Sequence, residues 1–358
     1  MAGPGPASGL SAGPGGGESG APLAIALSPI LAARYRGRDL DRIREAAPGA
    51  RLITLSVEGL ADGPLEDVEV LLRGWLSAEA FDRLLSRAPR LTWVHSASAG
   101  VERALTPAAR ERGVVITNAR GVFSRPIAEY VVMMILAVSR RLPQLLELQR
   151  ERTWQPLEGA ELRDVTVGIV GLGSIGRAVA TLAGAFGCRI VATRRRTDVG
   201  SAATTPDPDE DATIGDLALD RVLGPEGLPE LLAESDFVVL AAPLTPDTEG
   251  MIDAAALAAM KPGAWLINVA RGRLVDERAL LRALRDGPIG GAVLDTFTEE
   301  PLPPASPFYD LPNAIVTPHT SWSSGRVLDR SVGLFCENLR RFAAGAPLIN
   351  VVDPGAGY

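Results

Sequence analysis

Lysine, histidine and cysteine are all scarce in this chain of 358 residues. Lys261 is the single lysine, and it stands in an M-K-P-G segment typical of a helix-ending turn, which argues against Schiff-base chemistry. Two cysteines, Cys188 and Cys336, offer no disulfide framework and no metal-ligand spacing, so we expect a reducing, cytoplasmic setting and no metal site. If the protein moves protons near neutral pH, the carrier is therefore one of only two histidines, His95 and His319.

Long apolar runs and an excess of positive charge are also missing. The longest purely apolar run, residues 131–138, is far shorter than the ~20 residues that a membrane span needs. The N-terminus shows no basic segment followed by an apolar one, as a signal peptide would. A formal net charge of -7 argues against nucleic acid as the main partner. We therefore expect neither a membrane nor a nucleic-acid partner, and we find no Walker A sequence and no G-x-S-x-G elbow.

The most informative stretch is residues 165–176, V-T-V-G-I-V-G-L-G-S-I-G, in which an apolar strand leads into a glycine-rich turn. Gly171, Gly173 and Gly176 fill the G-x-G-x-x-G spacing of dinucleotide-binding units. The first allows the tight turn, the second lets the backbone approach a pyrophosphate, and the third lets the following helix, expected at 177–186, pack closely. The phosphates would then lie at a helix N-terminus, where free N–H groups and the helix dipole favour negative charge.

Apolar strand-like runs alternate with helical patterns along most of the chain, which is typical of βαβ units around parallel sheets. Before the glycine motif, we expect strands at 23–27, 51–55, 68–72, 91–95 and 114–117, with helices at 40–46 and 78–86. After it, we expect strands at 189–193, 236–241, 264–268, 291–294 and 314–317, and a last helix at 324–344.

Three further segments stand out by composition. A nearly wholly apolar helical pattern begins at Pro126 and ends before Pro143, so we expect it in the core or in an interface. Residues 1–22, rich in glycine, proline, alanine and serine, are expected to be a disordered tail. The acidic segment 197–213 is expected to be a disordered surface insertion.

Three polar segments follow the glycine-rich unit, each at the end of an expected strand. They are I-N-V-A-R-G with Asn268 and Arg271, L-D-T-F-T-E-E-P with Asp295 and Glu300, and T-P-H-T-S-W with His319. Because ligands of doubly wound sheets bind outside the carboxyl ends of the strands, we expect the arginine, the glutamate and the histidine to reach one crevice. Taken singly, Arg271 fits a surface ion pair, Glu300 a solvated loop charge and His319 a hydrogen-bonded turn residue. Their joint placement at strand ends favours a functional site.

Together, these motifs resemble those of the D-isomer-specific 2-hydroxyacid dehydrogenase family over about residues 90–345. Further matching segments are A-G-V-E at 99–102, N-A-R-G at 118–121, A-P-L-T-P-D-T-E-G at 242–250 and M-K-P-G-A-W-L-I-N-V-A-R-G at 260–272. The resemblance implies an α/β protein with two Rossmann-like domains and doubly wound parallel sheets. A flavodoxin-like substrate domain would comprise 23–122 and 323–352, and an NAD(P)-binding Rossmann domain would be inserted at 123–322. It also implies a homodimer joined through the nucleotide-binding domains.

The resemblance implies a role for each residue of the three polar segments. The arginine aligned with Arg271 binds the carboxylate and carbonyl of a small 2-oxo acid, for which a planar guanidinium is suited. The histidine aligned with His319 donates the proton to the forming hydroxyl, or removes it in oxidation, and the glutamate aligned with Glu300 favours the imidazolium. The aspartate aligned with Asp295 contacts the nicotinamide amide. Related formate dehydrogenases carry glutamine at the position of Glu300, so the glutamate favours hydroxyacid chemistry.

The first half of the chain is also expected to bind substrate. Backbone N–H groups around Ala99 and Gly100 would hold the substrate carboxylate. His95 either lines the substrate pocket or is a hydrogen-bonded residue at a strand end, and we do not assign it the proton. The substrate side chain would meet loops near 27–30, 95–100 and Trp322, and its chemistry stays open.

The end of strand 189–193 bears on the choice of cofactor. NAD-binding units carry an acidic residue about 20 residues after the glycine motif, where it holds the ribose 2′-OH. Here three arginines, 194–196, follow the strand instead. Because a guanidinium binds a 2′-phosphate that a carboxylate would repel, we expect NADP(H) to be preferred, with NAD(H) as the alternative. The expected cofactor-binding residues, including those implied by the resemblance, are Gly171, Gly173, Ser174, Ile175, Gly176, Arg194, Arg195, Pro243, Thr248, Ala270 and Asp295.

Three functions remain open at this point. The leading one is a D-2-hydroxyacid dehydrogenase that acts mainly as a 2-oxoacid reductase. The second is oxidation of phosphite or another small anion on the same scaffold. The third is a non-catalytic dinucleotide-sensing protein, like the corepressors that share this fold. Fold alone does not separate them.

Overall fold

The computed structural model describes residues 22–35, 37–195 and 219–355. The chain divides into two compact units, the first formed by 1–120 with 326–358 and the second by 121–325. Most of the expected 1–22 tail, the whole acidic 197–213 segment and Arg196 lie outside the described residues. Each unit is built on a parallel sheet, which confirms the expected α/β fold class.

The sheet of unit 1 has five parallel strands in the order β2-β1-β3-β4-β5. The chain passes from β1 to β2 on one side and then returns to β3 on the other, so the strand order reverses between β1 and β3. In open sheets of this kind, the crevice at the carboxyl ends of the strands beside the reversal is where ligands bind. The strands are β1 (Ala24–Leu27), β2 (Arg51–Thr54), β3 (Val68–Arg73), β4 (Trp93–Ser96) and β5 (Val115–Asn118).

Helices cover both faces of this sheet, because alternate side chains of each strand point to opposite faces. On one face, Ile25, Leu72 and Trp93 pack with α1 (Pro29–Arg34), α2 (Gly37–Ala46) and α11 (Val327–Ala343). On the other face, Ala26 and Leu71 pack with α3 (Ala78–Arg87) and α4 (Pro107–Glu111). The C-terminal helix therefore belongs to the core of unit 1.

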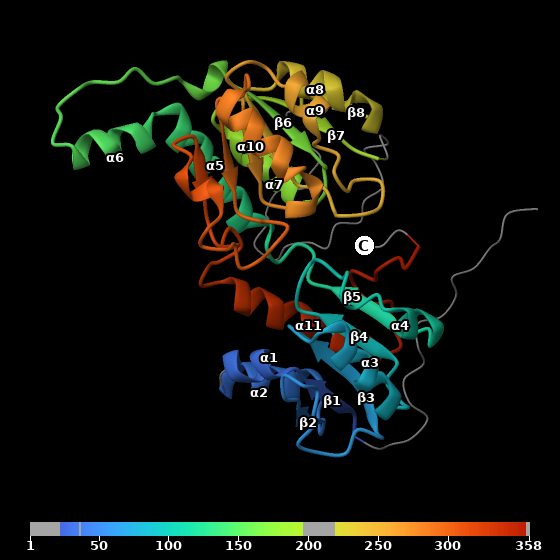
Figure 1. Cartoon of the computed structure of the whole chain (residues 1–358). Coiled ribbons are helices and arrows are strands. Elements are labelled where there is room, and N and C mark those ends of the chain that lie inside the picture. The colour runs from blue at the N-terminus through green and yellow to red at the C-terminus, as the bar shows by residue number, and fades with distance from the viewer. Residues whose placement is uncertain (1–21, 36, 196–218, 356–358) are drawn as a thin grey trace, which may run out of the picture. The chain divides into compact units, whose positions relative to one another are not determined.

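The sheet of unit 2 has seven parallel strands in the order β12-β11-β10-β9-β6-β7-β8. Its order reverses between β6 and β9, directly beside the glycine-rich turn. The strands, labelled where visible in Figure 1, are β6 (Thr166–Val170), β7 (Arg189–Thr193), β8 (Arg221–Leu223), β9 (Phe237–Leu240), β10 (Trp265–Asn268), β11 (Gly291–Leu294) and β12 (Ala314–Val316).

Two layers of helices enclose this sheet. On one face, α5 (Ser124–Ser139) and α7 (Ser174–Ala185) pack on β6, β7 and β9 in one core. On the other face lie α8 (Leu228–Glu234), α9 (Ala254–Ala259) and α10 (Glu277–Asp286). Short 3-10 turns occur at Leu162–Asp164, Pro225–Gly227, Gly272–Leu274 and Pro307–Asp310.

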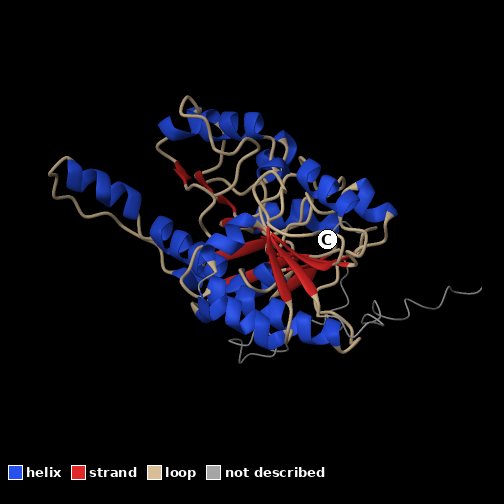
Figure 2. Cartoon of the chain, turned by 90° about the horizontal axis from the view of Figure 1, so that it is seen from below, coloured by secondary structure: helices blue, strands red, loops and turns tan. Residues whose placement is uncertain are grey.

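The apolar helical pattern before the glycine motif forms α5, and a second helix follows it. α5 is mostly buried and ends at Ser139, and Arg141 then adopts the left-handed conformation that ends the run. α6 (Leu142–Arg150) follows with Pro143 in its first turn, where proline is tolerated because the N–H has no intrahelical partner. α6 has no buried residue, and in both Figure 1 and Figure 2 it extends away from the rest of unit 2.

The structure differs from the expected elements mainly in its helices. α7 begins at Ser174 rather than at Arg177, because Gly173 takes the N-cap position. The sequence patterns did not predict α1, α4, α6, α8, α9 or α10, nor the three-residue strand β8. These elements are short or amphipathic, and their packing against the sheet stabilises them more than their intrinsic propensity does.

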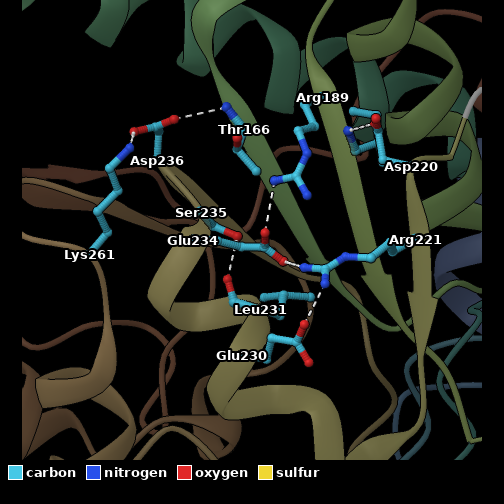
Figure 3. A network of polar contacts seen from close by, with 11 residues as sticks. Thr166, Arg189, Asp220, Arg221, Glu230, Leu231, Glu234, Ser235, Asp236 and Lys261 are labelled. Atoms are coloured by element: carbon cyan, nitrogen blue, oxygen red, sulfur yellow. Dashed lines mark hydrogen bonds and ion pairs between the residues drawn. The ribbon is translucent and has the colours of Figure 1, made fainter.

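An ion-pair network fixes the amino ends of several strands of unit 2. Glu234, at the end of α8, accepts a hydrogen bond of 2.8 Å from Arg189 at the start of β7 and also pairs with Arg221 at the start of β8. Figure 3 shows that Arg221 reaches Glu230 as well. The network lies at the strand edge opposite the glycine-rich turn.

The single lysine belongs to the same edge. Lys261 Nζ lies 2.5 Å from Asp236, whose other carboxylate oxygen accepts the N–H of Thr166 at 2.8 Å (Figure 3). Lys261 therefore joins the loop after α9 to the starts of β6 and β9. Among the described residues, no helix is both long and apolar enough to cross a membrane.

Candidate active site

The glycine-rich turn has the shape that a dinucleotide requires. Gly171 has φ 100°, and a Cβ there would lie 2.6 Å from the backbone nitrogen of Ala242. A Cβ on Gly176 would collide with the carbonyl oxygen of Gly171. A Cβ on Gly173, by contrast, would have no atom within 4 Å, so the space in front of this residue is open. The residues present therefore fit a pyrophosphate that approaches the backbone at Gly173.

The N-terminus of α7 faces that open space. Gly173 is exposed and Ser174 and Ile175 are half-buried. The first N–H groups of a helix have no intrahelical partner and carry the positive end of the helix dipole. They can therefore donate to phosphate oxygens.

Two arginines lie close together beside this turn. Arg194 follows β7, and its Nη1 is buried without a hydrogen-bond partner among the described residues. Burial, together with the charge of Arg194, lowers the pKa of Arg177, which is only 6% exposed. Two guanidinium groups this close repel each other, and an anion between them would relieve both. Arg177 was not expected at this site, although its place directly after the last glycine of the motif put it in the first turns of the expected helix.

Arg195 and the other expected cofactor residues have less distinctive settings. Arg195 is exposed. Pro243, just after β9, is exposed, and its carbonyl oxygen accepts a 2.7 Å hydrogen bond from the hydroxyl of Thr248. Ala270 is buried after β10, and its N–H donates to the side chain of Asn268 at 3.1 Å. All four lie at the carboxyl edge of the unit 2 sheet.

His319 and Glu300 form a hydrogen-bonded pair. His319 Nδ1 lies 2.8 Å from Glu300 Oε2, and the side chains are 41% and 37% exposed. The N–H of Phe297 donates to the other carboxylate oxygen at 3.0 Å. Burial raises the pKa of Glu300, but hydrogen bonds from His319 and Phe297 and the charges of His319 and Arg271 outweigh it and leave this pKa below its ordinary value. The glutamate is therefore ionised beside the imidazole, and Arg271 lies near enough to act on it.

Asn268 positions the segment that carries Arg271. Its side chain is 1% exposed at the end of β10, where its Nδ2 donates to the carbonyl oxygen of Arg271 at 2.9 Å. Its Oδ1 accepts the N–H of Ala270. The guanidinium of Arg271 donates to the carbonyl oxygen of Ala270 at 2.7 Å. The backbone turn after β10 is thus fixed on both sides of Ala270.

Asp295 organises the loop that carries His319. Its carboxylate is 0% exposed and accepts hydrogen bonds from the hydroxyl of Thr317 and from the N–H groups of Thr320 and Ser321, at 2.6, 2.8 and 3.0 Å. Its carbonyl oxygen accepts the N–H of His319 at 2.9 Å. The expectation that Asp295 contacts a nicotinamide amide stays a prediction; in this structure its carboxylate is buried against the His319 loop.

Two aromatic residues support the same loop. The hydroxyl of Tyr130, on α5, lies 2.6 Å from that of Thr317. Trp322 donates its indole N–H to the carbonyl oxygen of His319 at 2.7 Å and meets the ring of Phe123 edge-on at 6.2 Å. Trp322 is therefore a packing residue of the His319 loop in this structure.

In unit 1, the turn after β4 presents two backbone N–H groups. The carbonyl oxygen of Ser98 accepts the N–H of Ala119, and that of Ala99 accepts the side-chain amide of Asn118. The carbonyl oxygen of Gly100 accepts the hydroxyl of Ser98. No hydrogen bond within the described part of the chain uses the N–H of Ala99 or Gly100. A turn whose carbonyls are satisfied and whose N–H groups are available is suited to bind an anion.

His95 is buried in the core of unit 1. It is 0% exposed, its Nδ1 lies 2.8 Å from the hydroxyl of Thr117, and its ring packs 5.4 Å from that of Phe335. Burial lowers its pKa to about 3, so it is neutral near pH 7. Of the two places considered for His95, the structure favours the hydrogen-bonded strand-end residue. Its place among the substrate-binding residues stays a prediction, which the complete burial of the side chain does not support.

No group of three or more His, Cys, Asp or Glu side chains in the described ranges could hold a metal ion.

Comparison with known proteins identifies the family. The family model for the NAD-binding domain of D-isomer specific 2-hydroxyacid dehydrogenases matches residues 132–321. The chain belongs to the D-isomer-specific 2-hydroxyacid dehydrogenase family. A glyoxylate reductase of Korarchaeum cryptofilum is 33% identical over 325 residues, which cover 88% of this chain and 90% of that enzyme. A D-3-phosphoglycerate dehydrogenase of Mycobacterium tuberculosis is 36% identical over 290 residues. The chain spans about half, 51%, of the length of that dehydrogenase.

Solved structures of this dehydrogenase family share the fold. A member from Xanthobacter autotrophicus in complex with NADPH and MES has a TM-score of 0.79 and 32% identity, and the match covers 94% of this chain and 100% of that one. An NADPH-dependent glyoxylate/hydroxypyruvate reductase from Sinorhizobium meliloti, in complex with NADP and sulfate, has a TM-score of 0.77 and 29% identity over the same shares.

Proposed function

We propose that this member of the D-isomer-specific 2-hydroxyacid dehydrogenase family interconverts a small 2-oxo acid and the D-2-hydroxy acid, acting mainly as a reductase. The observation that carries the proposal is the arrangement of Arg271, Glu300 and His319 at the carboxyl edge of a dinucleotide-binding sheet. Such an arrangement supplies the charge, the proton and the orientation that carbonyl reduction needs. When bound, the nicotinamide would supply the hydride.

His319 would supply the proton to the forming hydroxyl. Because its Nδ1 is hydrogen-bonded to Glu300, its Nε2 is the nitrogen left to face a substrate. The carboxylate of Glu300, whose pKa is lowered, keeps its negative charge beside the ring, and its hydrogen bond orients the imidazole. Positioned proton transfer of this kind contributes about 10²–10⁴-fold to a rate.

Arg271 would bind the carboxylate of the substrate. A guanidinium offers planar, paired donors to a carboxylate or a polarised carbonyl oxygen. In unit 1, the available N–H groups of Ala99 and Gly100 are suited to hold a carboxylate. Neither role requires a metal ion.

The direct test is to mix the protein with NADPH and a panel of 2-oxo acids and to follow the nucleotide absorbance. Glyoxylate, hydroxypyruvate, pyruvate and phenylpyruvate span the range of side chains, and we expect turnover of at least one. Tight binding of NADPH without turnover of any of them would support a dinucleotide-sensing protein instead. Reduction of NADP by phosphite alone would support small-anion oxidation.

We further propose that NADP(H) is the preferred cofactor. The buried, unpartnered Nη1 of Arg194 and its closeness to Arg177 support a site for the 2′-phosphate. We expect kcat/KM to be higher with NADPH than with NADH. Arg194→Ala should lower kcat/KM for NADPH by about 10- to 100-fold, because it removes one or two charge-assisted hydrogen bonds. The same substitution should leave kcat/KM for NADH within about threefold of the wild-type value.

NADH provides the internal control for this experiment, because it lacks only the 2′-phosphate. A wild-type preference for NADH, or an equal loss with both cofactors in Arg194→Ala, would contradict the assignment.

A homodimer and a cytoplasmic setting complete the proposal. Exposed apolar side chains on α5, α6 and the segment after them support a second copy as partner; they are Met133, Leu142, Leu145, Leu146 and Trp154. Several large apolar side chains exposed on neighbouring segments often mark an interface. The two cysteines are buried free thiols, as expected for a chain kept in a reducing compartment.

A further inference from the structure

His319 has a backbone conformation that residues other than glycine rarely adopt. Its φ is 49°, in the left-handed region, and Pro318 directly precedes it. Its N–H donates to the carbonyl oxygen of Asp295 at 2.9 Å, and its carbonyl oxygen accepts the indole N–H of Trp322 at 2.7 Å. The backbone of the proposed proton donor is therefore held from both sides. Strain of this kind persists only where the surrounding structure imposes it.

The carboxylate of Asp295 holds the residues on both sides of this histidine. It accepts the hydroxyl of Thr317, two residues before His319, and the N–H groups of Thr320 and Ser321, which follow it. Because a carboxylate only accepts hydrogen bonds, the hydroxyl of Thr317 must donate its single proton to Asp295. The oxygen of Thr317 is then available to a further partner only as an acceptor.

Tyr130, on α5, supplies the proton that this oxygen can accept. Its hydroxyl lies 2.6 Å from that of Thr317, and because the proton of Thr317 is directed to Asp295, Tyr130 is the donor of this bond. The side chain is only 9% exposed. Burial and the charge of Asp295 raise the pKa of Tyr130 to about 12, although the hydrogen bond with Thr317 acts in the opposite direction. The phenol therefore keeps its proton and remains a donor near neutral pH.

These bonds form one directed chain, from Tyr130 through Thr317 to Asp295. Both side-chain bonds are 2.6 Å long, and hydrogen bonds in such a chain polarise and strengthen one another. Thr317 directly follows β12 and Asp295 directly follows β11, so the chain joins the ends of two adjacent strands to α5. All of these residues, together with His319, belong to unit 2.

We propose that Tyr130 is a positioning residue for proton transfer by His319. Its hydroxyl directs Thr317 toward Asp295, and Asp295 then holds the left-handed histidine in place. The inference rests on the proposed reductase function and adds to it a residue that acts through the histidine loop. Phenylalanine at this position would keep the ring but leave the oxygen of Thr317 without its donor, so the hydroxyl of Thr317 could turn away from Asp295.

The first test measures single turnovers of Tyr130→Phe with NADPH bound. The complex is mixed with the best 2-oxo acid of the wild type, and the decay of NADPH absorbance gives the rate constant of reduction. We expect this rate constant to fall by about 4- to 10-fold, which corresponds to the loss of one hydrogen bond. The Kd for NADPH should stay within about twofold, because sites without shared contacts act independently. A weaker Kd with an unchanged rate constant would overturn the inference.

A double-mutant cycle with His319→Ala distinguishes positioning of the histidine from a general packing effect. If Tyr130 acts through His319, Tyr130→Phe should change the residual rate constant of His319→Ala by less than about twofold. A packing effect would cause the same loss whether or not the histidine is present. Such an equal loss, or an unchanged rate constant in Tyr130→Phe itself, would contradict the proposal.

Substitutions of Thr317 test the chain at its middle. Thr317→Val removes the hydroxyl and should lower the rate constant at least as much as Tyr130→Phe does. Thr317→Ser should keep most of the rate, because serine can make the same two bonds. Tyr309→Phe is the matched control, since Tyr309 is 53% exposed and its hydroxyl donates only a long, 3.5 Å bond to Leu302. It should leave the rate constant within about twofold. Wild-type rates in Thr317→Val would refute the chain.

A measurement without substrate separates this inference from the function on which it rests. The chain has only two histidines, so the NMR signals of their ring nitrogens can be assigned with His319→Ala. We expect Tyr130→Phe to shift or broaden the signals of His319 and to leave those of His95 unchanged. Unchanged His319 signals would overturn the inference even if the enzyme is active. If the His319 signals change but the wild type reduces no 2-oxo acid, the proposed function fails and the positioning of His319 by Tyr130 stands.

Discussion

Replacing His319 with alanine should lower kcat for 2-oxoacid reduction by about 10²–10⁴-fold while the Kd for NADPH stays within about twofold. The imidazole is 41% exposed and hydrogen-bonded through Nδ1 to Glu300, so its loss removes the proton donor without disturbing the glycine-rich turn. Steady-state kinetics give kcat, and the fluorescence of bound NADPH gives the Kd. The thermal midpoint should change little, because the ring is only partly buried.

The second histidine provides the matched control. His95 is fully buried and bonded to Thr117, and its low pKa keeps it neutral. His95→Gln keeps a polar group in that place and should retain kcat within about threefold in the folded protein. If His319→Ala lost NADPH binding and turnover to the same extent, or if His95→Gln alone abolished turnover, the assignment of the proton to His319 would be wrong.

Replacing Arg271 with lysine should lower kcat/KM by about 30- to 1000-fold, although the positive charge is kept. Lysine cannot present two parallel N–H donors to a carboxylate, and each lost charge-assisted hydrogen bond is worth about 1.5–3 kcal/mol, or about one to two powers of ten. Most of the loss should appear as a raised KM for the 2-oxo acid. Initial rates over a range of acid concentration, at saturating NADPH, measure both constants.

Arg273→Lys is the control for this variant. Arg273 lies two residues further on, and its guanidinium pairs with Glu249 at the surface, with side chains 55% and 49% exposed. Exposed pairs contribute little, so this change should alter kcat/KM by less than about twofold. Equal effects of the two substitutions would show that Arg271 acts only through general charge or local packing.

Much of the fold could be predicted from the sequence because parallel strands buried on both faces are short, apolar runs. The expected strands at 189–193 and 291–294 coincide with β7 and β11, and the other expected strands differ from the observed ones by one or two residues at their ends. The glycine motif could be located because close contacts at Gly171 and Gly176 exclude any side chain. Positions at which only glycine fits can therefore be recognised in the sequence.

The short helices could not be predicted, because α8 and α9 have seven and six residues and depend on the sheet for stability. The pairing of Glu300 with His319 was expected from the family resemblance and from their joint placement at strand ends, and the structure shows it as a 2.8 Å hydrogen bond. The burial of Asp295 and His95 was missed because a polar residue at a strand end gives no sign of whether it faces solvent or the core.

The left-handed backbone conformation of Trp75, with φ 50°, could not be predicted from the sequence either. Its neighbours are held by tertiary contacts, from the N–H of Gly74 to Ser28 and from the side chain of Arg73 to the carbonyl oxygen of Arg103, which join residues far apart in the chain. Arg177 was overlooked for a related reason: its significance comes from its closeness to Arg194, which only the packing of α7 against β7 reveals.

The most direct test of the central claim is to follow the transferred hydrogen. The wild-type protein is incubated with NADPH that carries deuterium at the transferring C4 position and with its best 2-oxo acid, and the product is analysed by mass spectrometry and chiral chromatography. We predict a D-2-hydroxy acid that carries one deuterium on C2. A product without that deuterium, or the L-enantiomer, would contradict the account.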